Sequence, residues 1–335
     1  MAYDVQVKID LTKPIGTVGF GVPLLLVENA AKAVEYAEVS NLEELASAGI
    51  TADSDAYKAA QLIFAQAHAP KQIAVCAVTT AAATALADVK LTDKNWRQLI
   101  VINDGDSESS VQAISTAVEA LPGKMYFAGL EVDDTTTITV TDLRRTVLFY
   151  CSATEVVPVP VAALVGEIAG RAAGSFTYKN LILTGVEAQE LTDAEITAIH
   201  KKGGITFVQK AGDRVTSEGK VAGGEYIDII DCEDYIIQQM TYKTQKVLNS
   251  SAKVPYDNNG IALLESVAVD VLQAAYNNGM IATNPDGTPA YSVSYAMRED
   301  TKESDRANRL YLGGSFTFAL AGAIHECVIT GSITV

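Results

Sequence analysis

The chain has 335 residues, 48% apolar and 20% charged, which excludes a disordered protein and is enough for two or three compact units. Its 41 acidic residues against 25 basic ones give a net charge of −16, which argues against nucleic acid or an anionic membrane as partner. This acidity either complements a basic protein surface or only aids solubility.

The first predicted element is a half-buried strand over residues 3–11. Val5, Val7, Ile9 and Leu11 alternate with polar residues, which is the period of a strand with one apolar side. Glycines and prolines follow, so residues 1–22 are expected to form an N-terminal arm and linker. From the pattern alone, this strand is either an ordinary first strand or an arm donated to another chain. The opening residues lack the basic and apolar regions of a signal peptide, and no apolar run of the chain is as long as a membrane span.

Residues 23–204 alternate between apolar runs and helical stretches. This alternation predicts an α/β domain with a largely parallel sheet. Ser40 with Glu43, and Thr192 with Glu195, have the spacing of capping boxes. The strands are expected at 24–27, 73–78, 99–102, 125–130, 147–151 and 181–183, and the helices at 54–67, 109–120, 161–173 and 192–202.

A second domain, of the α+β class, is expected over residues 205–335. Apolar runs at 205–208 and 226–230 flank a glycine-rich turn. A helix follows, with Glu233 and Asp234 at its start, where acidic residues suit the helix dipole.

The next predicted helix, residues 260–278, has a nearly complete apolar face, and Gly279 stands where a left-handed cap belongs. Its apolar positions are Leu264, Val267, Ala268, Val271, Leu272 and Ala275. Its opposite face carries Glu265, Ser266, Asp270, Gln273 and Asn277.

The C-terminal region is predicted to form strands separated by a charged surface segment at 297–309. Two alternating runs, 310–320 and 323–335, close the chain. In the second run Cys327, Ile329, Ile333 and Val335 share one side. Both termini are therefore strand-like, a pattern suited to exchange of strands between chains.

No residue pattern indicates a catalytic, cofactor or metal site. The sequence has no phosphate-binding loop, no nucleophile elbow and no paired cysteine or histidine ligands. The acidic stretch at 103–108 could hold a hard cation, but it also makes a good turn and helix N-cap. Four well-separated cysteines are expected to be buried thiols in a reducing cytoplasm: Cys76, Cys151, Cys232 and Cys327.

The order of motifs after residue 203 resembles the C-terminal domain of contractile phage tail sheath proteins. The matching parts are the strand at 205–208, the turn with Gly212, Asp213 and Arg214, and the segment Gly224-Glu225-Tyr226-Ile227-Asp228 with its helix. Val254-Pro255-Tyr256, the residues Asn258, Asn259 and Gly260, and the helix ending in Asn278-Gly279-Met280-Ile281 follow in the same order. The resemblance covers about 130 residues well and the rest only in architecture.

The resemblance implies a structural subunit that assembles as stacked hexameric rings, in a helical polymer around an inner tube, and contracts. It implies no enzyme activity and no cofactor. The partners would be further copies, exchanging residues 1–20 and roughly 310–335 as strands, a tail tube protein, and baseplate and tail terminator proteins. The protein would be made in a bacterial host's cytoplasm and reside in the tail of a virion or tail-like particle.

In the sheath family a helix of the C-terminal domain is thought to contact the tube. Glu265, Asp270, Gln273 and Asn277 are the candidates here, although the same face could simply meet water. Two other functions stay open: another phage tail protein, such as a tube or baseplate component, and an α/β ligand-binding enzyme. A tube protein would be mostly β, and the missing phosphate loop argues against a nucleotide enzyme.

Overall fold

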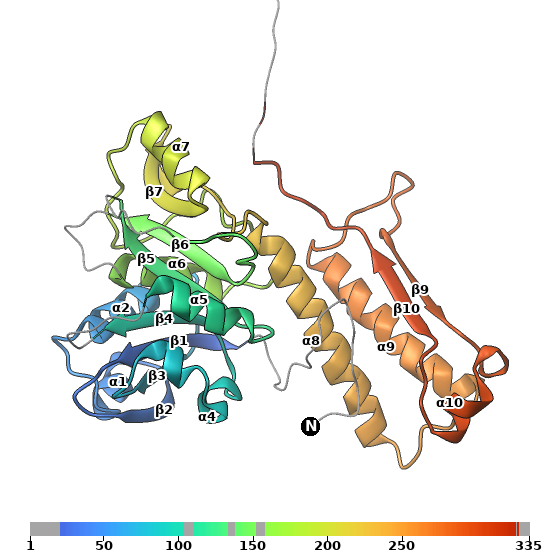
Figure 1. The fold of residues 1–335 in the computed structure, drawn as a ribbon. Coiled ribbons are helices and arrows are strands. Elements are labelled where there is room, and N and C mark those ends of the chain that lie inside the picture. Colours follow the sequence, from blue (N-terminus) through green and yellow to red (C-terminus); the bar gives the residue numbers. More distant parts are fainter. Residues whose placement is uncertain (1–20, 104–109, 133–137, 152–157, 326, 328–335) are drawn as a thin grey trace, which may run out of the picture.

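The computed structural model describes residues 21–103, 110–132, 138–151, 158–325 and 327. It has two parts (Figure 1): an α/β part built on one large sheet, and a second part made of two long helices beside a small sheet. Helix α8 (Ile227–Ser250) connects them, because it begins against the α/β part and continues alongside α9 (Asn258–Asn277).

The α/β part is organised around an eight-stranded sheet with the order β2-β3-β1-β4-β5-β6-β7-β8. Five neighbouring pairs, from β3/β1 to β6/β7, are parallel. Only the edge pairs β2/β3 and β7/β8 are antiparallel, so the expected largely parallel sheet is confirmed. The strands are β1 (Val22–Glu28), β2 (Val34–Val39), β3 (Ile73–Ala77), β4 (Trp96–Asn103), β5 (Met125–Glu131), β6 (Thr146–Cys151), β7 (Gly204–Lys210) and β8 (Asp213–Thr216).

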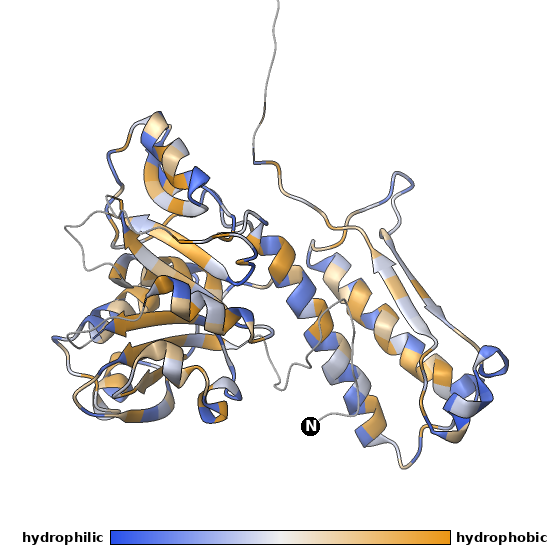
Figure 2. Ribbon diagram, viewed as in Figure 1, coloured by the Kyte–Doolittle hydropathy of each residue, from blue (hydrophilic) through white to orange (hydrophobic). Residues whose placement is uncertain are grey.

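Both faces of this sheet are covered, which explains why inner strands such as β1 and β3 are continuous apolar runs. In β1, Leu25 faces one core together with α2 and α6, whereas Leu24 faces another core together with α5. Gly166 allows α6 to lie close to α2, since a Cβ there would be 2.6 Å from the backbone of Ile63. Figure 2 shows the resulting band of hydrophobic strands. The helices are α1 (Leu42–Ser47), α2 (Asp55–Phe64), α3 (Ala82–Ala85), α4 (Val89–Thr92), α5 (Val111–Glu119), α6 (Pro158–Ala169) and α7 (Asp193–Lys201).

Two local predictions in this part need correction. The first capping box is displaced by one residue, because Asn41 caps α1 by accepting from the Glu44 N–H, and Glu44 accepts from the Ser40 N–H. In the run at 181–183, Leu181 and Leu183 are buried but Ile182 is 64% exposed, and the run is not a strand. It is held instead by reciprocal hydrogen bonds between Leu181 and Thr216. The capping box of Thr192 and Glu195 is confirmed.

The sheet continues beyond residue 204, where a second domain was expected to start. β7 pairs in parallel with β6, and β8 pairs with β7, so both strands complete the α/β sheet. Helix α8 also starts earlier than expected, at Ile227. Glu233 and Asp234 consequently lie about two turns inside the helix and not at its N-terminus.

The second part has a core of its own between α8, α9 and a two-stranded sheet. Its antiparallel strands are β9 (Tyr291–Tyr295) and β10 (Gly314–Phe318). The run at 310–320, expected to be exchanged between chains, is therefore partly paired within its own chain. Between these strands, the charged segment forms a short 3₁₀ turn (Arg298–Asp300) and α10 (Glu303–Ala307), which is largely hydrophilic in Figure 2.

Candidate functional site at the junction of the two parts

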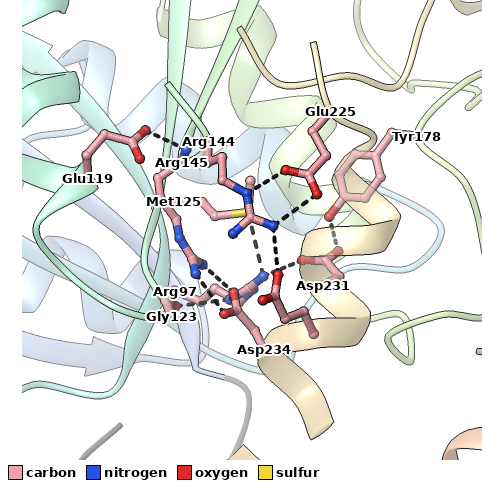
Figure 3. Close-up of polar contacts among 11 residues, drawn as sticks. Arg97, Glu119, Gly123, Met125, Arg144, Arg145, Tyr178, Glu225, Asp231 and Asp234 are labelled. Carbon is pink, nitrogen blue, oxygen red and sulfur yellow. Dashed lines mark hydrogen bonds and ion pairs between the residues drawn. The ribbon is translucent and has the colours of Figure 1, made fainter. Parts of the chain in front are cut away.

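The most concentrated charged cluster among the described residues lies where α8 meets the sheet. Figure 3 shows Arg97 from β4 and Arg145 from the residue before β6 pointing at two carboxylates on α8. Asp231 and Asp234 are three residues apart, so their side chains share one face of the helix. Arg97 and Asp234 are each only 2% exposed. We call these four residues the junction cluster.

Each carboxylate of the junction cluster receives several hydrogen bonds. Arg97 donates to Asp234 over 2.7 Å and also to Asp231. Arg145 donates through both terminal nitrogens to Asp234, one of them over 2.9 Å. The Tyr178 hydroxyl donates to the second oxygen of Asp231. An outer pair of contacts joins Arg144 to Glu225 and Glu233 at the rim of the cluster.

Neighbouring arginines keep the Asp234 carboxylate charged. Burial alone would raise the pKa of Asp234, but Arg97 and Arg145 outweigh burial and hold that pKa below its usual range. Burial and the neighbouring Asp231 raise the pKa of Tyr178, which therefore stays protonated and donates. Buried ion pairs of this kind add little net stability compared with apolar packing, but losing one partner is costly. They restrict α8 to one orientation on the sheet.

This cluster was not predicted from the sequence, because Asp234 was expected at the start of a helix. Two signals were present. Asp231 and Asp234 share a helix face with Ile227, which is buried, and Arg144-Arg145 directly precedes an apolar strand. Charged residues at positions where apolar ones are expected indicate a buried ion pair.

Other polar groups in the described part of the chain do not converge on a reaction centre. The three histidines lie in separate places: His68 beside Glu167, His200 beside Ser217, and His325 beside Thr177. Among the residues described, no group of three potential ligands could hold a metal ion. No helix within the described ranges is long and apolar enough to cross a membrane. Of the acidic stretch at 103–108, only Asn103 is described, so the two interpretations of that stretch lie outside the described residues.

Helix α9 has the apolar face that its periodicity predicts, with Val267, Ala268, Val271, Leu272 and Ala275 buried. Gly279 has a φ of 80°, the expected left-handed conformation. The four polar candidates do not form one uniform face. Asp270 is exposed and pairs with Lys243 of α8 over 2.5 Å. Gln273 accepts from the Tyr291 hydroxyl on β9 and donates to Asn277, while Glu265 is half-buried.

Comparison with solved structures identifies the fold. No family model matches the chain, and no curated protein sequence matches it. A chain of the helical sheath of the anti-feeding prophage (AFP) in its contracted state superposes with a TM-score of 0.72 and 12% identity, covering 98% of each chain. A chain of the AFP baseplate structure gives 0.73 and 15% identity, covering 99% of this chain and 98% of that chain. The sheath tail protein of Listeria innocua gives 0.57 and 12% identity, covering 91% and 96%.

The chain has the fold of contractile sheath proteins. The similarity extends over both parts of the molecule, and not only over the C-terminal region in which the sequence motifs occur. The junction cluster of this chain thus lies within a sheath-like fold. It connects the α/β part to the helix that leads into the second part.

The predicted arms fall mostly outside the described residues. Val5, Val7, Ile9 and Leu11 lie there, as do Ile329, Ile333 and Val335. Cys327 is described and is exposed, contrary to the expectation that all four cysteines are buried. Cys76, Cys151 and Cys232 are buried as expected.

Proposed function

We propose that the protein is the structural subunit of a contractile sheath, in a phage tail or a phage-tail-like particle. Subunits polymerise as stacked hexameric rings around an inner tube, and contraction of the polymer drives the tube through a target envelope. The observation that supports this most strongly is the fold similarity over 98% of both chains to a sheath solved in its contracted state. The protein would be made in a bacterial host's cytoplasm and reside in the assembled tail.

Such a function requires neither catalysis nor a cofactor. The junction cluster fits this role, because its charges are buried and already paired with one another. A general acid or base would instead have to reach a substrate. The cluster positions a helix and does not offer a reactive group.

The subunits would be connected by exchanged strands. Among the described residues, β9 and β10 form a sheet of only two strands, and such a sheet can accept further strands at its edges. The N-terminal arm with Val5, Val7, Ile9 and Leu11 and the C-terminal residues Cys327, Ile329, Ile333 and Val335 are the proposed donors. Exchange by backbone hydrogen bonds allows rings to rotate without losing contact, because flexible linkers absorb the motion.

The tube contact is proposed on α9, at Glu265, Asp270, Gln273 and Asn277. The support is that Asp270 is exposed and has one surface ion pair, with Lys243. Such a pair contributes about 0–1 kcal/mol, so it can be exchanged for a basic group on the tube at small cost. Many weak contacts repeated around each ring would hold the tube and still release it. The remaining partners are baseplate and tail terminator proteins.

Electron microscopy of the purified protein tests the proposal. Stacked rings or hollow tubes of the protein, alone or with a tube protein, are expected. A protein that stays monomeric at high concentration, with or without a tube protein, would contradict it. A thermal-shift screen with nucleotides provides the second measurement, since clear stabilisation by a nucleotide would favour a ligand-binding enzyme.

A further inference from the structure

The segment that follows β10 spans the two parts of the molecule. At its start, Leu320 forms a bridge with Ile281, and the Ala321 N–H donates to the Met280 carbonyl over 2.9 Å. These contacts hold the segment on the end of α9. In Figure 1 the segment then leaves the small sheet and runs towards the α/β part. We call residues 320–325 the strap.

The far end of the strap is held by one side chain, His325. Its Nε2 lies 2.8 Å from the Thr177 hydroxyl, and its ring packs edge-on against Tyr226 with the centroids 4.9 Å apart. Its Nδ1 lies 3.6 Å from a carboxylate oxygen of Glu218. Only 10% of the His325 side chain is exposed. Thr177, Glu218 and Tyr226 come from three different segments, so His325 occupies a formed site.

Between these two attachments the strap is loosely packed. Ala321, Gly322 and Ala323 line a cavity of about 200 Å³, whose other walls include Cys232 and Met280. A Cβ on Gly322 would have no atom within 4 Å. Residues with few packed neighbours separate from a protein at low free energy. The attachment at His325 therefore decides whether the far half of the strap stays on the α/β part.

We propose that His325 is a latch that holds the far half of the strap on the α/β part, and that its release lets the strap lift. The latch follows from the contacts of the single chain. Its use in assembly rests on the proposed sheath function, in which the extension must reach a neighbouring copy while subunits rotate.

Hydrogen exchange of the isolated, full-length subunit tests the latch. In His325→Ala, the Ala321 amide, which is protected by its hydrogen bond to the Met280 carbonyl, should exchange roughly tenfold faster than in the wild type, because a hydrogen bond and a ring contact that hold the strap are lost together. Ile324→Ala is the matched control, because Ile324 is the neighbouring residue and is 89% exposed. Its exchange should equal that of the wild type.

Thr177 provides an independent route to the same result. Thr177→Val keeps the side-chain shape and removes the hydroxyl, so it should accelerate exchange of the Ala321 amide, whereas Thr177→Ser should not. Combining Thr177→Val with His325→Ala should add little to His325→Ala alone. If His325→Ala does not fold, judged by exchange of the α/β sheet amides, the two Thr177 variants decide the matter.

Wild-type exchange in folded His325→Ala or Thr177→Val, or equal acceleration in Ile324→Ala, would overturn the latch. The result is separable from the proposed function. Faster exchange in a protein that never polymerises would support the latch and contradict the sheath. Unchanged exchange in the variants of a protein that does polymerise would contradict the latch and support the sheath.

Discussion

Asp234 illustrates how single residues determine the geometry of this molecule. It accepts hydrogen bonds from Arg97 of β4 and from Arg145, the residue directly before β6. A buried carboxylate with two charged donors has few alternative positions. Its contribution is therefore to specify where α8 lies.

The first prediction concerns this carboxylate. Asp234→Ala removes the group to which both arginines donate and should lower the free energy of unfolding by about 3–5 kcal/mol. Asp270→Ala, at an exposed ion pair, should lower it by about 1 kcal/mol or less. Urea denaturation measures both. The double variant Arg145→Met with Asp234→Leu should lose less unfolding free energy than Asp234→Ala, because it does not leave the Arg145 guanidinium buried without a counter-charge. A larger loss in the double variant would argue against this account.

The second prediction concerns Lys124, whose Nζ donates to the carbonyls of Lys94 and Trp96. Burial, together with Arg97, lowers its pKa from the ordinary 10.5 to about 7. Between pH 7 and 10.5 the unfolded chain therefore binds more protons than the folded protein. Lys124 should therefore make the free energy of unfolding rise with pH in this interval, by at most about 1.4 kcal/mol per pH unit. Below pH 7 the destabilisation from burying the charged Lys124 ammonium group is present in full.

Lys124→Met should remove that rise. Unfolding free energies of wild type and variant at pH 7 and pH 9 give the comparison, and Lys90→Met, at an exposed position, is the control. The wild type and the control should gain stability relative to Lys124→Met between the two pH values. Parallel behaviour of all three proteins would show that Lys124 is not responsible.

At the scale of the element, the apolar and polar residues of α9 have different roles. Its apolar face packs into the core of the second part. Its polar residues are divided between neighbouring elements, with Asp270 beside α8 and Gln273 beside β9. A proposed tube contact on this helix therefore depends on the residues whose present contacts can be broken at a small cost in free energy, above all Asp270.

The third prediction tests that contact. Replacing Glu265 and Asp270 by lysine should block co-assembly with tube protein while the melting temperature of the isolated subunit changes little. High salt should weaken wild-type co-assembly through screening. Lysine at Glu303 and Asp305 of α10 makes the same change in net charge and serves as the control. If the variant with both charges reversed still forms normal sheaths around tubes, the tube contact lies on another surface.

At the scale of the whole molecule, the two parts are joined by a continuous helix and by the strap. The N-terminal half of α8 is held on the sheet by the junction cluster, and its C-terminal half packs on α9. The subunit is thus suited to move as one body. Changes in assembly would then fall on the terminal extensions, as exchanged strands require.

The fourth prediction follows for the N-terminus. Deleting residues 2–12 should leave a folded, soluble subunit with a melting temperature near that of the wild type, because the cores of both parts are built from later residues. If residues 2–12 are the proposed exchanged arm, the same variant should no longer polymerise, as seen by electron microscopy and sedimentation. Unfolding of the truncated chain, or normal assembly, would reject the role of this segment as an exchanged arm.

Local patterns in the sequence determined much of the fold. The apolar run of β1 predicted a strand buried on both faces, and the spacing from Val267 to Ala275 predicted the buried face of α9. The left-handed Gly279 and the capping box at Thr192 and Glu195 were also predicted. These features succeed because they depend on residues a few positions apart, whose geometry is set by the helix or strand itself.

Tertiary structure alone decided which elements meet. Periodicity shows that a face is buried but does not name its partner, so β7 and β8 were assigned to the second domain although they complete the α/β sheet. The run at 310–320 was expected to pair with another chain, yet β10 pairs with β9. Arg97 and Asp231 are 134 residues apart. A charge compensated over such a distance looks like a surface residue in sequence, because only the folded chain brings its counter-charge near.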